Sequence, residues 1–493
     1  MSRFGLPLIT DSDNPLPEKV MGYVSVRGKE SVFSPQTKKL NTSAKAYHGS
    51  KNNRRSVGKD LLASGFEVVA ESALGMSVWA EPGQFEELTG GKVMPRERLM
   101  QTDGVREYVT CLDIVGDKQP AALGVGAVKS KSSKMDGVVL ETPKQYHAVF
   151  PSPIPLTSSK FHLRLPDDVA VLLGAKSAHG QGVRGDGVSV VMPDSGWYRH
   201  PFFTAHGYKV KTPIAAVPGT NRSKDPIGHG TGESANIFAV APGAVLQPIR
   251  GTDAGGHFVG VLAAFLKGKA LSPKIMTNSW GGDSEFPPSG GPDPADLSFA
   301  AEVQDAIENG ILVIFSAGNG QFSIEPQIPG VLAVGGAFID QGGQMRASDY
   351  ASGYKSPWFN VVVPTVCGLV GMQPRAQYLM LPVQPGCELD QSESVFDEEA
   401  GDGTNGQDGW AMFSGTSAAA PQVAGAAALI LSAKPGLKPA QVITALSKTA
   451  TDVVVGHSFP QQFNEPAKPG FDNATGWGLV NASAAVDYAK AHF

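Results

Sequence analysis

The chain has 493 residues, of which 41% are hydrophobic and 18% charged, and its net charge is −5. This length exceeds what one hydrophobic core usually supports, so it predicts a large domain with a smaller one. The composition, which includes 59 glycines, is that of a globular, loop-rich α/β protein and excludes a disordered or fibrous one. The small negative charge gives no reason to expect nucleic acid as a partner.

Three cysteines, Cys111, Cys367 and Cys387, are an odd number without a CxxC spacing. We therefore expect free thiols rather than a disulfide framework or a zinc site. The N-terminus, MSRFGLPLITDSDNPLP, lacks the apolar segment of a secretory signal, and no run approaches the roughly 18 apolar residues of a membrane span. These features predict a cytoplasmic protein without a membrane partner.

Strand and helix signals in the first part of the chain have the spacing of a small α+β domain. Four strands are predicted at residues 21–28, 66–72, 75–81 and 92–100, and two helices at 56–64 and 83–88. In this order the elements predict a split βαβ, ferredoxin-like domain over residues 1–103. Residues 104–160 follow with many Ala, Gly, Lys, Ser and Pro, a composition typical of an exposed linker with some strand content.

Residues 161–493 alternate helical segments with near-continuous apolar strands. The strands are predicted at 187–196, 245–250, 274–279 and 311–320. This alternation is typical of an α/β fold with a doubly wound, mostly parallel sheet that helices cover on both faces. Functional loops of such sheets lie at the carboxyl ends of the strands.

The segment 414–433, SGTSAAAPQVAGAAALILSA, has no charge and predicts a helix that is buried on every side. Pro421 comes one turn after Ser417, near a helix start, where proline is better tolerated than in the interior. Ser417 would then lie at the helix N-terminus, where unpaired N–H groups and the helix dipole favour negative charge. A serine there suits an oxyanion site, but taken alone it could also be a simple helix cap.

Three candidate side chains occur in the order Asp194, His229, Ser417, which is one of the known orders of a catalytic triad. Their segments, DSG, HGT and GTSAAAP, resemble those of the subtilisin family of serine endopeptidases. The segments VAPGAVLQPIR, NSWGG and FSAGNG between them are similar to that family as well, as is the C-terminal GWGLVNASAAV. The resemblance extends from about residue 165 to the C-terminus and implies a subtilisin-like fold and a serine endopeptidase activity.

The resemblance also assigns roles to these residues. Ser417 would be the nucleophile, His229 the base that takes its proton, and Asp194 the group that fixes the imidazole tautomer. The Asn319 side chain and the Ser417 N–H would stabilise the oxyanion. No cofactor is expected for this chemistry.

By the same resemblance, two short segments would bind the substrate. One is an extended edge that pairs with the peptide backbone, and the other lines the primary pocket; their residues are Ser279, Trp280 and Gly281, and Ser316, Ala317 and Gly318, respectively. Backbone pairing accommodates many sequences, so we expect broad recognition of peptide or protein substrates.

Two features depart from the family pattern. Pro193 removes a strand N–H directly before Asp194, so we expect a local adjustment there. Residues 370–411 form an insertion whose second half holds eight acidic residues between 388 and 408. These acids do not match an EF-hand loop, which favours a solvated acidic loop over a structural calcium site, although the family often binds calcium.

The N-terminal domain resembles the propeptide of this family, an inhibitor and folding aid. This implies a zymogen that cleaves itself within residues 104–160, with its own propeptide as a partner.

Two alternatives remain. A sedolisin-like acid peptidase shares the serine motif; His229 and Asn319 argue against it, while Glu233, one turn after His229, keeps it open. The other is a catalytically silent pseudoprotease that only binds peptides.

Overall fold

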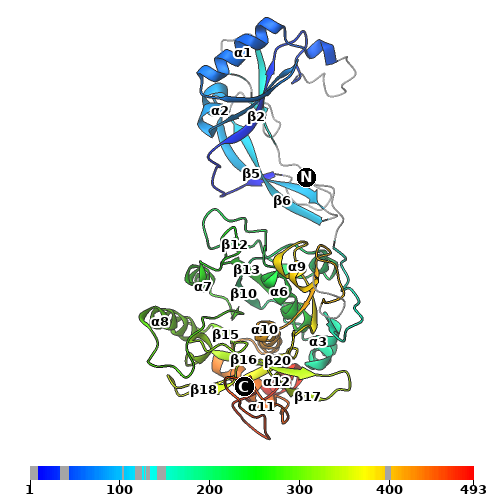
Figure 1. The fold of residues 1–493 in the computed structure, drawn as a ribbon, viewed down its shortest axis with the longest axis vertical. Helices are drawn as coiled ribbons and strands as arrows, with labels where there is room; N and C mark the ends of the chain where they lie inside the picture. Colours follow the sequence, from blue (N-terminus) through cyan, green and yellow to red (C-terminus); the bar gives the residue numbers. More distant parts are fainter. Residues whose placement is uncertain are drawn as a thin grey trace. The chain divides into compact units, whose positions relative to one another are not determined.

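The computed structural model describes residues 9–33, 44–102, 105–116, 125–126, 128, 134–141, 151–394 and 401–493. The chain divides into two compact units, Met1–Val149 and Phe150–Phe493, and each unit has its own hydrophobic core (Figure 1). The three cysteines are buried and unpaired, so the prediction of free thiols is confirmed.

The first unit is built on a five-stranded sheet in the order β3-β4-β2-β8-β7. Its strands are β2 (Val20–Val26), β3 (Glu67–Glu71), β4 (Gly75–Ala80), β7 (Val125–Gly126) and β8 (Met135–Leu140). Helices α1 (Lys51–Ala63) and α2 (Pro82–Thr89) pack on it, since Val57 and Leu61 of α1 and Phe85 of α2 share one core with β2, β4 and β8. The connection β2-α1-β3-β4-α2-β8, with β8 antiparallel beside β2, is the predicted split βαβ topology.

The fourth strand of this sheet is not the one that the sequence suggested. Residues 92–100 lie in β5 (Lys92–Thr102), which forms a long hairpin with β6 (Val105–Val115). With β1 (Ile9–Asp11) they form a separate three-stranded sheet. The place beside β2 is taken by β8, whose Val138 and Leu140 are fully buried, although the surrounding composition had indicated a linker.

Residues 104–160, which were predicted to be a linker, instead belong partly to the first unit and partly to the second. The first unit extends to Val149 and not to residue 103. Residues 151–160 belong to the second unit, because the Ser152 carbonyl accepts a hydrogen bond from Trp410 Nε1 at 2.9 Å and Ser158 Oγ donates to the Asp402 carbonyl at 2.7 Å.

The second unit contains a nine-stranded sheet in the order β11-β13-β10-β14-β15-β16-β17, with β12 beside β13 and β20 beside β16. The strands are β10 (Ser189–Asp194), β11 (Lys209–Val210), β12 (Ile214–Ala215), β13 (Val245–Arg250), β14 (Ile275–Asn278), β15 (Leu312–Ser316), β16 (Leu332–Ile339), β17 (Met345–Ala347) and β20 (Val366–Leu369). All of its pairs are parallel except β16 with β17. The predicted mostly parallel sheet is confirmed.

Helices cover both faces of this sheet (Figure 1). One face carries α3 (Asp167–Leu172), α4 (Ala175–Gly180), α5 (Pro201–Ala205), α6 (His229–Val240), α10 (Thr416–Ala433), α11 (Pro439–Thr449) and α12 (Ala482–His492), and the other α7 (Val261–Ala270) and α8 (Pro294–Glu308). Alternation along β10 explains the two layers: Val190 and Met192 enter the core with α6 and α10, while Val191 enters the core with α7 and α8.

Two small sheets complete this unit. The first has the order β22-β21-β9 and joins β22 (Trp410–Phe413) and β21 (Leu379–Pro382) to β9 (Leu163–Arg164), and the second pairs β18 (Tyr354–Lys355) with β19 (Val362–Val363). Helix α9 (Glu388–Ser394) lies in the insertion. The insertion thus contains β21, which pairs with β22, the strand that directly precedes α10.

Helix α10 is the central element, as its sequence predicted. Among the described residues it is the one helix whose length and apolar composition would allow it to cross a membrane, and 83% of this stretch is buried inside the second unit. Burial within a protein core accounts for the same composition.

Candidate active site

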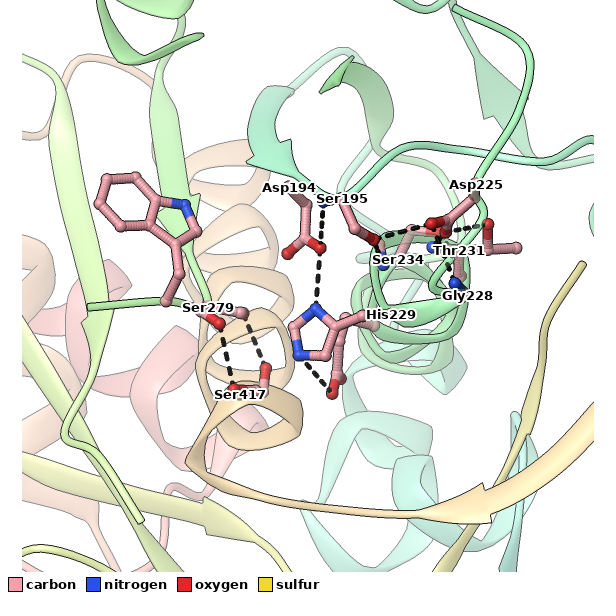
Figure 2. A network of polar contacts seen from close by, with 12 residues as sticks. Asp194, Ser195, Asp225, Gly228, His229, Thr231, Ser234, Ser279 and Ser417 are labelled. Atoms are coloured by element: carbon pink, nitrogen blue, oxygen red, sulfur yellow. Dashed lines mark hydrogen bonds and ion pairs between the residues drawn. The ribbon is translucent and has the colours of Figure 1, made fainter. Parts of the chain in front are cut away.

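The candidate catalytic side chains meet at the carboxyl edge of the large sheet. Strands β10, β14 and β15 run parallel and adjacent, so the loops that follow them open at one edge. Asp194 ends β10, His229 begins α6, and Ser417 is the second residue of α10. Figure 2 shows the imidazole between Asp194 and Ser417.

Asp194 fixes the orientation of His229. Its Oδ1 accepts a hydrogen bond from His229 Nδ1 at 2.8 Å and another from the Ser195 N–H at 2.6 Å, and the residue is 2% exposed. The proton therefore sits on Nδ1, which leaves Nε2 to accept one. Burial opposes protonation of His229, but the Asp194 carboxylate outweighs it and raises the pKa of the imidazole above its ordinary value.

Ser417 is held by a reciprocal pair of hydrogen bonds with Ser279. Ser417 Oγ donates to the Ser279 carbonyl at 3.1 Å, and Ser279 Oγ donates to the Ser417 carbonyl at 2.8 Å. Pro421 explains the second bond, because proline has no N–H and cannot occupy the carbonyl four residues earlier, which is that of Ser417. The nucleophile candidate is thus anchored to the segment that follows β14, and its Oγ hydrogen bond goes to Ser279 and not to His229.

Asn319 lies next to the start of α10 with a fixed amide orientation. Its Oδ1 accepts hydrogen bonds from the N–H and the Oγ1 of Thr416, at 2.9 and 3.0 Å. Its Nδ2 has no acceptor within the described part of the chain and remains a donor. A Cβ on Gly415 would lie 2.9 Å from Nδ2, so a side chain at this position would displace the amide from its present orientation.

The first predicted substrate segment, residues 279–281, is held through the Trp280 side chain. Trp280 Nε1 donates to the Pro193 carbonyl at 2.9 Å, and its ring packs edge-on against Phe258 and Phe315. The pairing of β10 with β14 ends at Val191, so the missing N–H of Pro193 breaks no hydrogen bond between these two strands. This is the local adjustment expected at Pro193.

The second predicted segment follows β15 and is firmly held. Ser316 and Ala317 are 7% and 0% exposed. The Gly318 N–H donates to Thr416 Oγ1 at 3.1 Å, and its carbonyl accepts from the Ser352 N–H at 2.9 Å. Substrate binding by both segments stays a prediction.

Asp225 is a positioning residue that the sequence analysis missed. Its buried carboxylate accepts four hydrogen bonds, from Ser195 Oγ at 2.8 Å, the Gly228 N–H at 3.0 Å, and the N–H and Oγ1 of Thr231 at 2.8 and 2.6 Å (Figure 2). These bonds tie the turn after Asp194 to the first turn of α6, where the helix dipole favours a negative charge. An Asp four residues before His229, in DPIGHGT, was the available signal for a helix cap.

The first turn of α6 also packs directly on the turn after β10. Ser195 Oγ accepts a hydrogen bond from the Gly230 N–H at 2.9 Å, and a Cβ on Gly230 would collide with the Gly196 carbonyl oxygen. A glycine directly after His229 is therefore required for the imidazole to reach Asp194.

The acidic insertion differs from the expected solvated loop. Asp390 and Asp402 are 0% exposed, and each accepts hydrogen bonds from backbone N–H groups: Asp390 from Gly386 and Gly409, Asp402 from Thr404 and Met412. The acids at 397–399 lie outside the described residues. Within the described ranges, no group of three or more His, Cys, Asp or Glu side chains could hold a metal ion.

Comparisons with known proteins identify the family. The model of the subtilase family matches residues 185–478, more than half of the chain. This chain belongs to the subtilase family. As a subtilase it is a serine endopeptidase, and its fold is the one that the resemblance implied.

This subtilase is similar to several characterised relatives. It is 27% identical over 328 residues to subtilisin Savinase of Lederbergia lenta, which covers 63% of this chain and 95% of the relative. It is 29% identical over 265 residues to fervidolysin of Fervidobacterium pennivorans, which covers 51% of this chain and 32% of the relative. A solved lanthipeptide protease is 23% identical with a TM-score of 0.47, covering 64% of this chain and 94% of that protein.

The network around Asp225 predicts a coupled loss of stability and activity in Asp225→Asn. The substituted amide cannot accept all four hydrogen bonds, which leaves buried donors unpaired at a cost of about 1–3 kcal/mol. We expect a lower urea midpoint and a lower kcat, because the first turn of α6 carries His229. Asp305→Asn on α8, whose carboxylate is 56% exposed, is the matched control and should change neither quantity appreciably. Wild-type stability and kcat in Asp225→Asn would refute the positioning role.

Proposed function

We propose that this serine endopeptidase cleaves peptide bonds through an acyl-enzyme on Ser417, with His229 as general base and Asp194 as its carboxylate partner. The observation that carries the proposal is the 2.8 Å hydrogen bond between Asp194 Oδ1 and His229 Nδ1, at the edge where α10 presents Ser417. A serine hydroxyl is a weak nucleophile at neutral pH and needs such a base.

In the first step, Ser417 Oγ leaves the Ser279 carbonyl, gives its proton to His229 Nε2 and attacks the peptide carbonyl carbon. The imidazolium is stabilised by Asp194 and then gives the proton to the leaving amine. In the second step, water gives a proton to the same nitrogen and attacks the acyl carbon. The imidazolium then returns the proton to Ser417 Oγ as the ester bond breaks, which releases the new carboxyl end and restores the Ser417 hydroxyl. Subtilases need no cofactor for these steps.

The oxyanion that forms in both steps would be stabilised by two donors. One is Asn319 Nδ2, whose amide is oriented by Thr416. The other is the Ser417 N–H, which as the second N–H of α10 has no acceptor within the helix. Donors that are already oriented need no rearrangement when the charge develops.

The substrate would be an extended peptide whose backbone pairs with residues 279–281. Because the Trp280 ring turns into the aromatic cluster, its backbone is the group available for pairing. Recognition through main-chain hydrogen bonds supports a broad specificity.

We expect Ser417→Ala to lower kcat by about 10⁶-fold, because the nucleophile is lost. A fluorophosphonate should label the wild type at Ser417 and not label this variant. Ser432→Ala, the same change at the other end of α10, should keep both labelling and activity.

Two results would contradict the proposal. A wild-type chain that is folded but never labelled would indicate a peptide-binding pseudoprotease. Activity confined to acidic pH would favour the sedolisin-like alternative.

Asn319→Asp tests the oxyanion site. It keeps an oxygen for Thr416 but replaces the Nδ2 donor with a second oxygen, so kcat should fall by about 10²–10³-fold. The KM should change little, since the donor acts on the charge that develops in the transition state. Asn309→Asp at the end of α8 is the control and should retain kcat. Full kcat in Asn319→Asp would exclude this residue from the oxyanion site.

The same proposal makes the first unit an N-terminal propeptide that the chain removes itself. Its split βαβ topology and its place before the catalytic unit support this role. Strand β8 pairs with β2, so a cut before Met135 would separate a strand from the sheet. The contacts of Ser152 and Ser158 hold residues 151–160 on the second unit. A cut between residues 141 and 151 would leave both sets of contacts intact.

Intact mass over a day at neutral pH tests this self-processing. We expect the wild type to release a fragment ending between residues 141 and 151, while Ser417→Ala remains whole. The experiment is repeated with and without calcium, and at several dilutions to separate cleavage within one chain from cleavage between chains. If the wild type hydrolyses peptides but its chain stays whole, self-processing is excluded and the endopeptidase proposal is unaffected.

A further inference from the structure

Glu233 is a buried carboxylic acid beside His229 that the proposed mechanism does not use. It is 1% exposed and lies on α6, four residues after His229, so both side chains are on the same side of the helix. Its Oε1 is buried without a hydrogen-bond partner among the described residues and lies 3.8 Å from His229 Nε2. This is the nitrogen that must exchange a proton with Ser417.

The other carboxylate oxygen of Glu233 is held by a chain of hydrogen bonds that leads to α10, the helix that carries Ser417. Glu233 Oε2 accepts a hydrogen bond from Asn236 Nδ2 at 3.0 Å, and Asn236 Oδ1 accepts from Gln422 Nε2 at 3.2 Å. Gln422, five residues after Ser417 on α10, is itself held by the N–H and the carbonyl of Leu369. Asn236 and Gln422 are fully buried. This chain of side chains joins the histidine helix to the serine helix and aims Oε1 at the imidazole.

Few other charged groups in the described part of the chain lie near His229, so the Glu233 carboxylate can have a clear effect on its protonation. The charged groups that act on His229 among the described residues are Asp194 at the end of β10, Glu233 on α6 and Asp225 in the loop before α6. Helix α10 and the segment after β14 contribute the Ser417 hydroxyl and the Ser279 carbonyl. Burial raises the pKa of Glu233 well above its ordinary value, while the neighbouring His229 lowers it. A protonated His229 therefore favours the ionised form of Glu233.

We propose that Glu233 is a positioning residue for the catalytic histidine, a second carboxylate that faces Nε2 and favours the protonated ring from the side opposite Asp194. This rests on the proposed function of His229. Ionised Glu233 keeps the proton on the imidazole and so raises the pH at which His229 becomes a base. The same charge stabilises the imidazolium once Ser417 has given up its proton.

The test is the pH dependence of kcat/KM in Glu233→Gln, which keeps the shape of the side chain and removes its charge. An opposite charge within ~4–6 Å shifts a pKa by at least about one unit, so the acidic limb should move about one pH unit toward acid. The rate on the alkaline plateau should fall, because a weaker base drives the proton transfer less. A loss of stability alone would lower the rate without moving the limb.

The matched control is Glu302→Gln, the same change on α8, where the carboxylate is 40% exposed and pairs with Lys269. Its acidic limb should coincide with that of the wild type. Should Glu233→Gln fail to fold, Asn236→Leu removes the donor to Oε2 and keeps the carboxylate. Since that donor favours the ionised form, this variant should shift the limb in the same direction by a smaller amount.

A second readout does not need activity. In Ser417→Ala protein, the ring signal of His229 is titrated by NMR with and without Glu233→Gln, and the midpoint should be lower by about one pH unit without the carboxylate. Unchanged midpoint and limb in both Glu233→Gln and Asn236→Leu overturn the inference. This outcome is separate from failure of the proposed function, which would appear as absent labelling of Ser417 in the wild type.

Discussion

The complete burial of α10 is the constraint on which the rest of the second unit depends. An uncharged helix of small and apolar residues is stable only when other elements surround it, and here the large sheet, α6 and α12 do so. Its small side chains allow α6 to pack closely along it. The two helices that carry His229 and Ser417 thus lie side by side within the core, and their first turns lie at the same edge of the sheet. The relative position of base and nucleophile follows from this packing and not from a loop.

Hydrogen bonds between distant segments then orient the side chains that helix packing has brought together. Asp225 joins the turn after β10 to α6, the hydrogen bonds of Ser279 join the segment after β14 to α10, and Thr416 orients the Asn319 amide. Each of these contacts connects two elements that come from distant parts of the sequence. Because the His229 and Asn319 side chains are oriented before any substrate binds, the reaction does not have to supply the free energy of ordering them. Glu233 belongs to the same arrangement, since Asn236, which donates to its carboxylate, is itself held by Gln422 of α10.

The large sheet, the central helix and the candidate catalytic residues could be predicted from the sequence. Most of the features that were missed depend on contacts between residues that are distant in the sequence or on backbone donors. Strand periodicity and the uncharged segment at 414–433 are local signals, and they correctly gave the parallel sheet and the central helix. Strand β8 was missed because its neighbour β2 is more than 100 residues earlier, while the composition around it is that of a linker. The segment 92–100 was placed in the wrong sheet because its hairpin partner β6 was taken for the start of that linker. Asp225 and the buried acids Asp390 and Asp402 depend on backbone donors that only the folded chain brings to them.

The Pro421 contact links the stability of α10 to the geometry of the substrate edge. A residue with an N–H at this position could take back the Ser417 carbonyl and complete the helical ladder, which would release the Ser279 hydroxyl. The helix would then be more regular, but the segment 279–281, which is expected to pair with the peptide, would lose its side-chain hydrogen bond to the Ser417 carbonyl. A change that made α10 more regular at Pro421 would therefore loosen the connection between the nucleophile and the segment expected to bind the peptide.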